Sequence, residues 1–144
     1  MNIIDVFVNI NLRERGMDMD ADFRRQLEEN GADVDMTLKR FMGNEAIYMK
    51  FIMKFLDDKS YGNIKESLGK CDYEEVFKSA HTLKGVTANL GLDPITSVSS
   101  QICELLRGKT NQDGDVDTDQ LNELWEQLEE IYGRFQKILI ENKQ

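Results

Sequence analysis

The chain of 144 residues carries a formal net charge of −9, with 40% hydrophobic and 31% charged residues. This length suits one domain with a sizeable core, and the composition excludes an intrinsically disordered chain. The acidic balance argues against nonspecific nucleic-acid binding, because that binding depends on Lys and Arg side chains that neutralise phosphates. The sequence contains neither an apolar run of the ~18 residues that span a bilayer nor a secretory signal. We therefore expect a cytoplasmic protein without membrane contact, in which Cys71 and Cys103 stay reduced as small buried hydrophobes.

The first 17 residues differ in pattern from the rest of the chain. Their apolar residues are typical of a strand rather than a helix: Ile3, Ile4, Val6, Phe7, Val8 and Ile10. The sequence leaves three alternatives open: a packed arm, a disordered tail, or upstream sequence translated ahead of a true start at Met17 or Met19. We assign residues 1–19 to an N-terminal arm of uncertain structure and residues 20–144 to one helical domain.

Helix signals begin at Asp20. Residues 21–30 predict a short helix that Gly31 ends, and Asp35 is expected to cap a second short helix over residues 36–42. Residues 44–69 predict a longer helix with a kink near residues 60–62. The methionine and aromatic residues of this region are interpreted as core and bundle-end packing: Met42, Tyr48, Met49, Phe51, Met53 and Phe55.

Three further long helices follow. Asp72 and Glu75 have the spacing of a capping box, ahead of a helix that ends at Gly91. Pro94 marks the start of the next helix, since proline fits the first helical position, and Gly108 ends that helix. A polar loop over residues 109–117 leads to a last helix that continues past residue 139. Four amphipathic helices joined by short turns predict an all-α, antiparallel up-down four-helix bundle, with the two short N-terminal helices covering one end.

The sequence contains no convincing metal or hydrolytic motif. The acidic segment from Asp113 has Thr118 where a calcium loop needs glycine and Leu124 where it needs a bidentate glutamate. The segment from Asp18 has Phe23 at the glycine position. One histidine and two distant cysteines give no zinc-ligand spacing. Because a nucleophile elbow and a phosphate-binding glycine loop are also missing, we do not expect an autonomous enzyme.

His81 is the only histidine in the chain. On a helical projection it lies close to the face opposite the predicted core face, which contains Val76, Ala80, Leu83, Thr87 and Leu90. A lone histidine on a helix is usually a surface or capping residue. However, a glycine inside a helix costs about 1 kcal/mol relative to alanine. Gly85, one turn after His81, therefore suggests that another molecule approaches the imidazole closely.

The neighbours of His81 suit a phosphoryl acceptor. A neutral imidazole on an exposed helix face has a ring nitrogen that can accept a phosphoryl group. The flanking Lys78 and Lys84 can stabilise the added negative charge, and Gly85 leaves space for a donor. Apolar contact beside the histidine comes from Phe77 and Ala88.

The string AHTLKGVTANLGL, residues 80–92, resembles the signature of histidine-containing phosphotransfer (Hpt) domains. The order in that family is histidine, two residues, lysine and glycine, then leucine-glycine at the helix end. The upstream string GADVDMTLKRFMGNEAIYMKFIMKFLDD is similar to the first helical region of the family, with landmarks at Arg40, Gly43 and Tyr48. The resemblance covers about residues 22–140.

This resemblance implies a phosphoryl carrier without catalysis of its own. In the family, the histidine takes a phosphoryl group from an aspartyl phosphate on a receiver domain and passes it to another receiver. The phosphorylated residue maps to His81, the electrostatic stabiliser to Lys84 and the small residue that admits the receiver to Gly85. Partner contact is expected at Phe77, Lys78 and Ala88. We expect a monomer that needs no cofactor, magnesium on the receiver, and receiver domains and a hybrid sensor histidine kinase as partners.

The chain departs from the family pattern at one position. The helix after the histidine often offers a glutamine or glutamate toward the imidazole, but Cys103 aligns there, with Gln101 and Glu104 on other faces. The group that orients His81 is therefore left open. Two other functions are also left open: a helical adaptor that binds a receiver or kinase without phosphotransfer, and a separated domain of a chemotaxis-type kinase that is phosphorylated in trans.

Overall fold

The computed structural model describes residues 19–112 and 114–143, and the regular secondary structure of these residues is helical. The predicted N-terminal arm therefore lies outside the described residues, except for Met19, which is buried in the core. In chain order the elements are α2 (Ala21–Glu29), α3 (Val34–Arg40), α4 (Glu45–Lys54), the 3₁₀ turn η1 (Phe55–Asp57), α5 (Ser60–Gly69), α6 (Tyr73–Leu90), α7 (Asp93–Leu106) and α8 (Thr118–Glu141).

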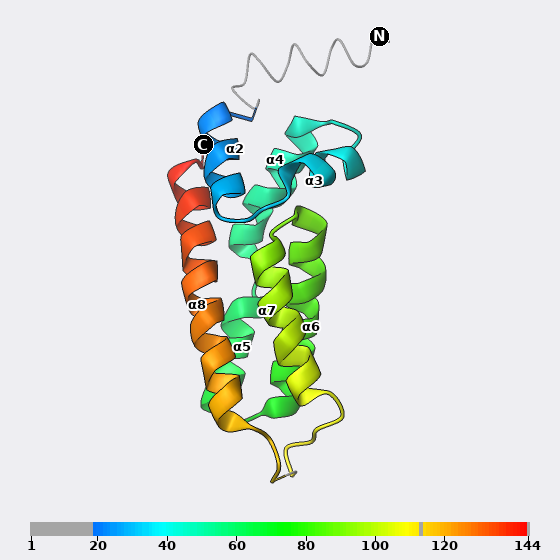
Figure 1. Ribbon diagram of the computed structural model, residues 1–144, viewed down its shortest axis with the longest axis vertical. Helices are drawn as coiled ribbons and strands as arrows, with labels where there is room; N and C mark the ends of the chain where they lie inside the picture. The colour runs from blue at the N-terminus through cyan, green and yellow to red at the C-terminus, as the bar shows by residue number, and fades with distance from the viewer. Residues whose placement is uncertain (1–18, 113, 144) are drawn as a thin grey trace.

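The long helices form an up-down bundle. Figure 1 shows α5, α6, α7 and α8 along the long axis of the molecule, with α4 continuing the line of α5 beyond η1. Each of these four helices runs opposite to the one before it, and α6 packs against both α5 and α7. The predicted all-α four-helix bundle is confirmed. The apolar faces of these helices pack against one another and form the core of the bundle.

The first bundle helix is broken, not kinked. α4 ends at Lys54, η1 follows, and Asp58 has an extended backbone with φ −68° and ψ 135°. The Asp58 carboxylate then accepts a hydrogen bond of 2.8 Å from the backbone N–H of Ser60, at the start of α5. The predicted kink at residues 60–62 was therefore wrong, because the chain breaks between Lys54 and Ser60 and Gly62 lies inside α5.

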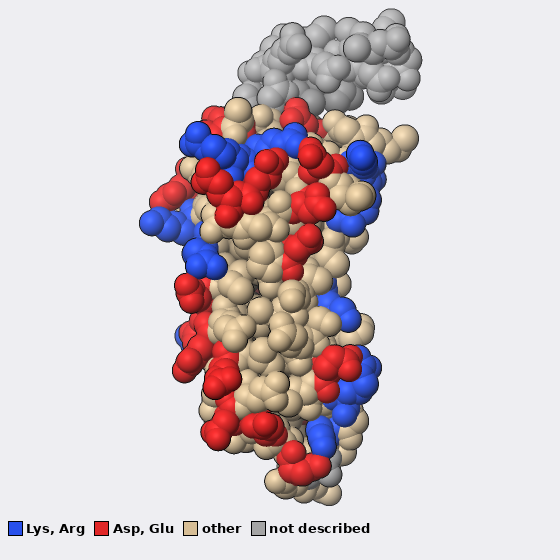
Figure 2. Space-filling view, viewed as in Figure 1, with Lys and Arg blue, Asp and Glu red and all other residues tan. Residues whose placement is uncertain are grey.

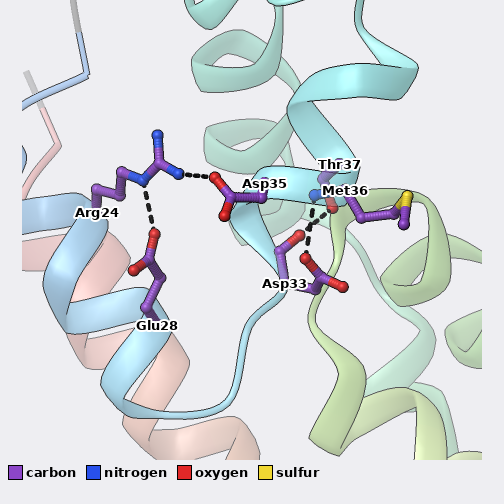
Figure 3. A network of polar contacts seen from close by, with 6 residues as sticks. All are labelled: Arg24, Glu28, Asp33, Asp35, Met36 and Thr37. Atoms are coloured by element: carbon purple, nitrogen blue, oxygen red, sulfur yellow. Dashed lines mark hydrogen bonds and ion pairs between the residues drawn. The ribbon is translucent and has the colours of Figure 1, made fainter.

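The second short helix begins earlier than predicted. Its N-cap is Asp33, whose carboxylate accepts a 3.0 Å hydrogen bond from the N–H of Met36, so the prediction of Asp35 as the cap was wrong. Figure 3 shows Asp35 instead pointing at Arg24 of α2, with which it forms an ion pair. The same guanidinium contacts Glu28 at 2.6 Å. These contacts connect α2 to α3 at the upper end of the bundle (Figure 1).

The helices α3 and α4 cover the C-terminal end of α6; the sequence analysis predicted a covering role for the two short N-terminal helices, α2 and α3, and not for α4. The last carbonyl groups of a helix have no partner within the helix. The Arg40 guanidinium donates to the carbonyl of Ala88 at 2.8 Å, and the Tyr48 hydroxyl donates to the carbonyl of Leu90 at 3.1 Å. Residues far apart in the sequence therefore fix this end of α6.

The opposite end of α6 is fixed by the loop between α7 and α8. The Asn111 amide oxygen accepts from the N–H of Glu74 at 3.0 Å, and its amide nitrogen donates to the Asp72 carboxylate at 2.9 Å. The backbone N–H of Asn111 donates to the Glu74 carboxylate at 3.2 Å. Both ends of α6 are thus held by other parts of the chain.

The interior agrees with most of the predicted apolar pattern. Tyr48 and Phe55 are buried, but Met42 is 93% exposed and Phe51 is 45% exposed, so the packing prediction was wrong for these two. Both cysteines are free, as expected, yet Cys71 is exposed rather than buried. Met42 and Cys71 lie in turns that follow α3 and α5, with φ of 56° and 54°, and Phe51 lines an open groove beside α4.

Acidic side chains gather along the edge formed by α8, while the middle of the same face is largely uncharged (Figure 2). The exposed acidic residues of α8 are Asp119, Glu123, Glu126, Glu129, Glu130 and Glu141. Much of the net negative charge therefore lies on a helix other than α6. Within the described residues, no helix is both long and apolar enough to cross a membrane.

Candidate functional site

The helix α6 carries the site and has the predicted ends. The Asp72 carboxylate caps it by accepting from the N–H of Glu75 at 3.2 Å, and Gly91 ends it in the left-handed region at φ 73°. One face of α6 is buried. It contains the five residues that the helical projection predicts, together with Ser79: Val76, Ala80, Leu83, Thr87 and Leu90. A helix fixed on one face in this way holds the residues of its other face at defined positions on the surface.

His81 lies on the exposed face of α6, as predicted. Its imidazole is 6.2 Å from the ring of Phe77, centroid to centroid, with the two ring planes inclined by 39°. Phe77 is itself half-buried and precedes His81 by one helical turn. Among the described residues, the imidazole has no hydrogen-bond partner, so its ring nitrogens face solvent.

The surface after His81 is open. A Cβ atom built on Gly85 would meet no atom within 4 Å outside its own helix backbone and chain neighbours, and both Gly85 and Ala88 are exposed. The absence of a side chain at Gly85 therefore does not serve packing within this chain. It leaves an open surface beside His81 that a second molecule could approach.

Positive charge flanks the histidine. Lys78 is exposed and Lys84 is half-buried, one on each side of His81 along α6. The ammonium group of Lys84 is near enough to α7 for its charge to contribute to a lowered pKa of Glu104 there, after the larger effect of Arg107. The charge of Lys84 therefore acts on α7 as well as on its own helix.

The side chain of Cys103 does not reach toward the imidazole. Cys103 is fully buried, and its thiol donates a weak 4.0 Å hydrogen bond to the carbonyl of Phe77. Burial raises the pKa of this thiol, so it stays protonated and uncharged. Gln101 contacts the carbonyl of Ser97 on its own helix at 3.4 Å. Neither Cys103 nor Gln101 orients His81 in this structure.

Arg107 is a residue of the site that the sequence analysis missed. Its guanidinium carbon lies 5.7 Å from the centroid of the Phe77 ring. The same guanidinium donates to the Glu104 carboxylate at 2.8 Å and 3.2 Å. The local sequence carried no signal for it, because Arg107 follows the last residue of α7 and reaches Phe77 only through the packing of α7 on α6. The structure therefore gives the site a third cation, on α7.

An open groove of about 490 Å³ runs beside the C-terminal half of α6. It separates α6 from the end of α3 and from α4, and its lining is largely apolar: Phe41, Phe51, Phe55, Val86 and Leu90, with Lys54, Asp57, Asp58 and Asn89. The groove is therefore a concave, partly aromatic surface on the helix that carries His81.

The arrangement is suited to accepting an anionic group on the imidazole, with cations on α6 and α7 and open space at Gly85. The part of the chain that the structure describes, which omits Asp18 and Asp113, contains no cluster of three or more His, Cys, Asp or Glu side chains that could hold a metal ion.

The family model described as Hpt domain matches residues 58–132, from the residues before α5 into α8. His81, Lys84 and Gly85 all lie inside this range. No curated protein and no solved structure matches the chain.

Proposed function

Because the chain belongs to the Hpt domain family, which serves histidine phosphotransfer in two-component signalling, we propose that His81 carries a phosphoryl group between receiver domains of response regulators. Hpt domains are phosphocarriers rather than catalysts, and their partners are the receiver and kinase proteins of phosphorelays. The observation that carries the assignment to His81 is its position, exposed on α6 beside Lys84 and the open surface at Gly85.

The transfer step uses the lone pair of the neutral imidazole. A ring nitrogen of His81 attacks the phosphorus of an aspartyl phosphate on the receiver. A P–N bond forms while the P–O bond to the aspartate breaks, and the aspartate leaves as a carboxylate. The other ring nitrogen keeps its proton, so the phosphorylated ring is cationic and remains a good leaving group for the reverse step to a second receiver.

The neighbouring residues supply charge and access. Lys84 stabilises the phosphoryl oxygens electrostatically, because a fixed cation near developing negative charge lowers the energy of the charged state. Gly85 lets the receiver bring its aspartyl phosphate up to the ring. Phe77, Lys78 and Ala88 form the surrounding contact surface, and the groove lined by Phe41, Phe51 and Val86 extends it. We further propose that the chain acts as a monomer and that magnesium is bound by the receiver.

The direct test is transfer of label from a phosphorylated receiver, in the presence of magnesium, to the wild-type chain and to His81→Gln. The wild-type chain should gain an acid-labile label, and His81→Gln should gain none while its circular dichroism stays unchanged, because the side chain is exposed. Label on His81→Gln would show that another residue is the acceptor. If the wild-type chain binds the receiver without gaining label, the chain is an adaptor.

Access to the imidazole is tested by Gly85→Gln, with Gly133→Gln as its matched control. Both glycines are exposed inside a helix, and a Cβ atom on either meets nothing within 4 Å. Both substitutions should raise stability by up to about 1 kcal/mol, since glycine is a poor helix former. Only Gly85→Gln should block transfer. Equal transfer by the two variants would contradict the role of Gly85.

A further inference from the structure

We propose that Glu104 is the counter-anion of the site. While His81 is unmodified, the Glu104 carboxylate binds Arg107 and attracts Lys84. It thereby shortens the lifetime of the phosphoryl group on His81. The inference rests on the proposed function of His81 and adds a residue that limits how long the signal persists. It makes Glu104 a positioning residue, because it acts through the two cations.

The geometry forms a chain of contacts between α7 and the histidine. The Glu104 carboxylate accepts two hydrogen bonds from Arg107, at 2.8 Å and 3.2 Å. The Arg107 guanidinium lies 5.7 Å from the Phe77 ring, which lies 6.2 Å from the imidazole. Glu104 thus anchors a cation that also lies against the aromatic neighbour of His81.

The electrostatic effect on Glu104 agrees with this arrangement. The hydrogen bond and charge of Arg107 hold the pKa of the Glu104 carboxyl below its usual value, and Lys84 contributes a smaller lowering. Arg107 and Lys84 therefore act on the same carboxylate, from α7 and α6 respectively. At neutral pH the carboxylate is ionised and partly neutralises both cations.

A phosphoryl group on His81 would compete for the same cations. It carries close to two negative charges at neutral pH, and a guanidinium binds phosphoryl oxygens through two parallel hydrogen bonds. The ion pair between Arg107 and Glu104 is weak. Their side chains are 55% and 65% exposed, and exposed ion pairs contribute little to stability. A change of one charge is therefore enough to shift Arg107 between Glu104 and the phosphoryl group.

Removal of the Glu104 charge should favour the phosphorylated state. Glu104→Gln keeps the size of the side chain but removes a negative charge that repels the phosphoryl group and occupies Arg107. We expect the half-life of phosphohistidine to rise about three- to tenfold at low salt, and less at high salt because ions screen exposed charges. Glu104→Asp should stay close to the wild type.

The experiment labels His81 with phosphoramidate, whose P–N bond breaks as ammonia leaves, so no receiver is required. Hydrolysis of the label is then followed in the wild type, Glu104→Gln and Glu104→Asp. Glu130→Gln is the matched control, since Glu130 forms an exposed ion pair with Arg134 at 3.0 Å on α8. Its half-life should equal that of the wild type.

The dependence on Arg107 is tested by adding Arg107→Gln to Glu104→Gln. The gain in half-life should fall to the small part that Lys84 provides. An unchanged half-life in Glu104→Gln, or a full gain that persists without Arg107, would overturn the inference. Failure of receiver-driven transfer to wild-type His81 would instead overturn the proposed function, because chemical labelling does not depend on the receiver.

Discussion

Replacement of Gly91 by alanine should destabilise the fold strongly. Gly91 ends the histidine-bearing helix α6 with φ 73°, in the left-handed region that residues with a Cβ atom avoid. Its carbonyl accepts a 2.8 Å hydrogen bond from the N–H of Asp33, just before α3. The substitution therefore strains the end of α6 at the place where α3 packs onto it.

The cost has two parts that the structure separates. Left-handed backbone costs a non-glycine residue about 1–2 kcal/mol. In addition, a Cβ atom on Gly91 would lie 2.0 Å from the hydroxyl oxygen of Thr37 and 2.7 Å from the carbonyl oxygen of Asp33. Thr37 is buried and its hydroxyl donates to that same carbonyl at 2.6 Å, a bond drawn in Figure 3, so turning the hydroxyl aside would break this bond. Overpacking of this kind costs about 1–3 kcal/mol, which gives a total of about 2–5 kcal/mol.

Gly108→Ala is the control for the backbone part. Gly108 has φ 74°, but a Cβ atom there meets nothing within 4 Å, so its cost should be about 1–2 kcal/mol. Urea unfolding followed by circular dichroism and by the fluorescence of Trp125, which stacks on Tyr61 at 5.1 Å, measures both variants. Equal losses of unfolding free energy in Gly91→Ala and Gly108→Ala would refute the steric argument.

Two further predictions concern the ends of α6. Burial raises the pKa of Tyr48 above the value of about 10 that it has when unfolded. Its contribution to stability is thus present below pH 10 and lost as the pH rises above it. Tyr48→Phe, which removes the bond to Leu90, should cost about 1 kcal/mol at neutral pH and make the alkaline fall in urea stability shallower. Asn111→Ala should speed amide hydrogen exchange at Glu74 without affecting the Leu90 end; unchanged exchange would show that the loop does not cap α6.

The histidine helix and the helices after it were predictable because their signals are local. A capping aspartate at Asp72, glycines at Gly91 and Gly108, and Pro94 at a helix start all act within a few residues of their own position. The apolar spacing of α6 likewise fixed which face is buried, and with it the exposure of His81. Short-range rules were sufficient for these features.

The errors arose where distant residues decide between local alternatives. Asp33 and Asp35 are both good helix caps, and the N–H of Asp33 bonds to Gly91, far along the chain, which selects Asp33. Arg107 was missed for a related reason. Its significance depends on the register between α7 and α6, which brings it over Phe77, and no local pattern contains that register.

The orientation of His81 follows from these same long-range contacts. α7 provides no side chain that bonds to the imidazole in this structure, but two of its residues converge on Phe77: Cys103 at the carbonyl and Arg107 at the ring. Phe77 in turn contacts His81 one turn further along α6. Here the influence of α7 on His81 passes through an aromatic ring and through charge, which is why Phe77 and Glu104 matter more to this site than the family pattern suggests.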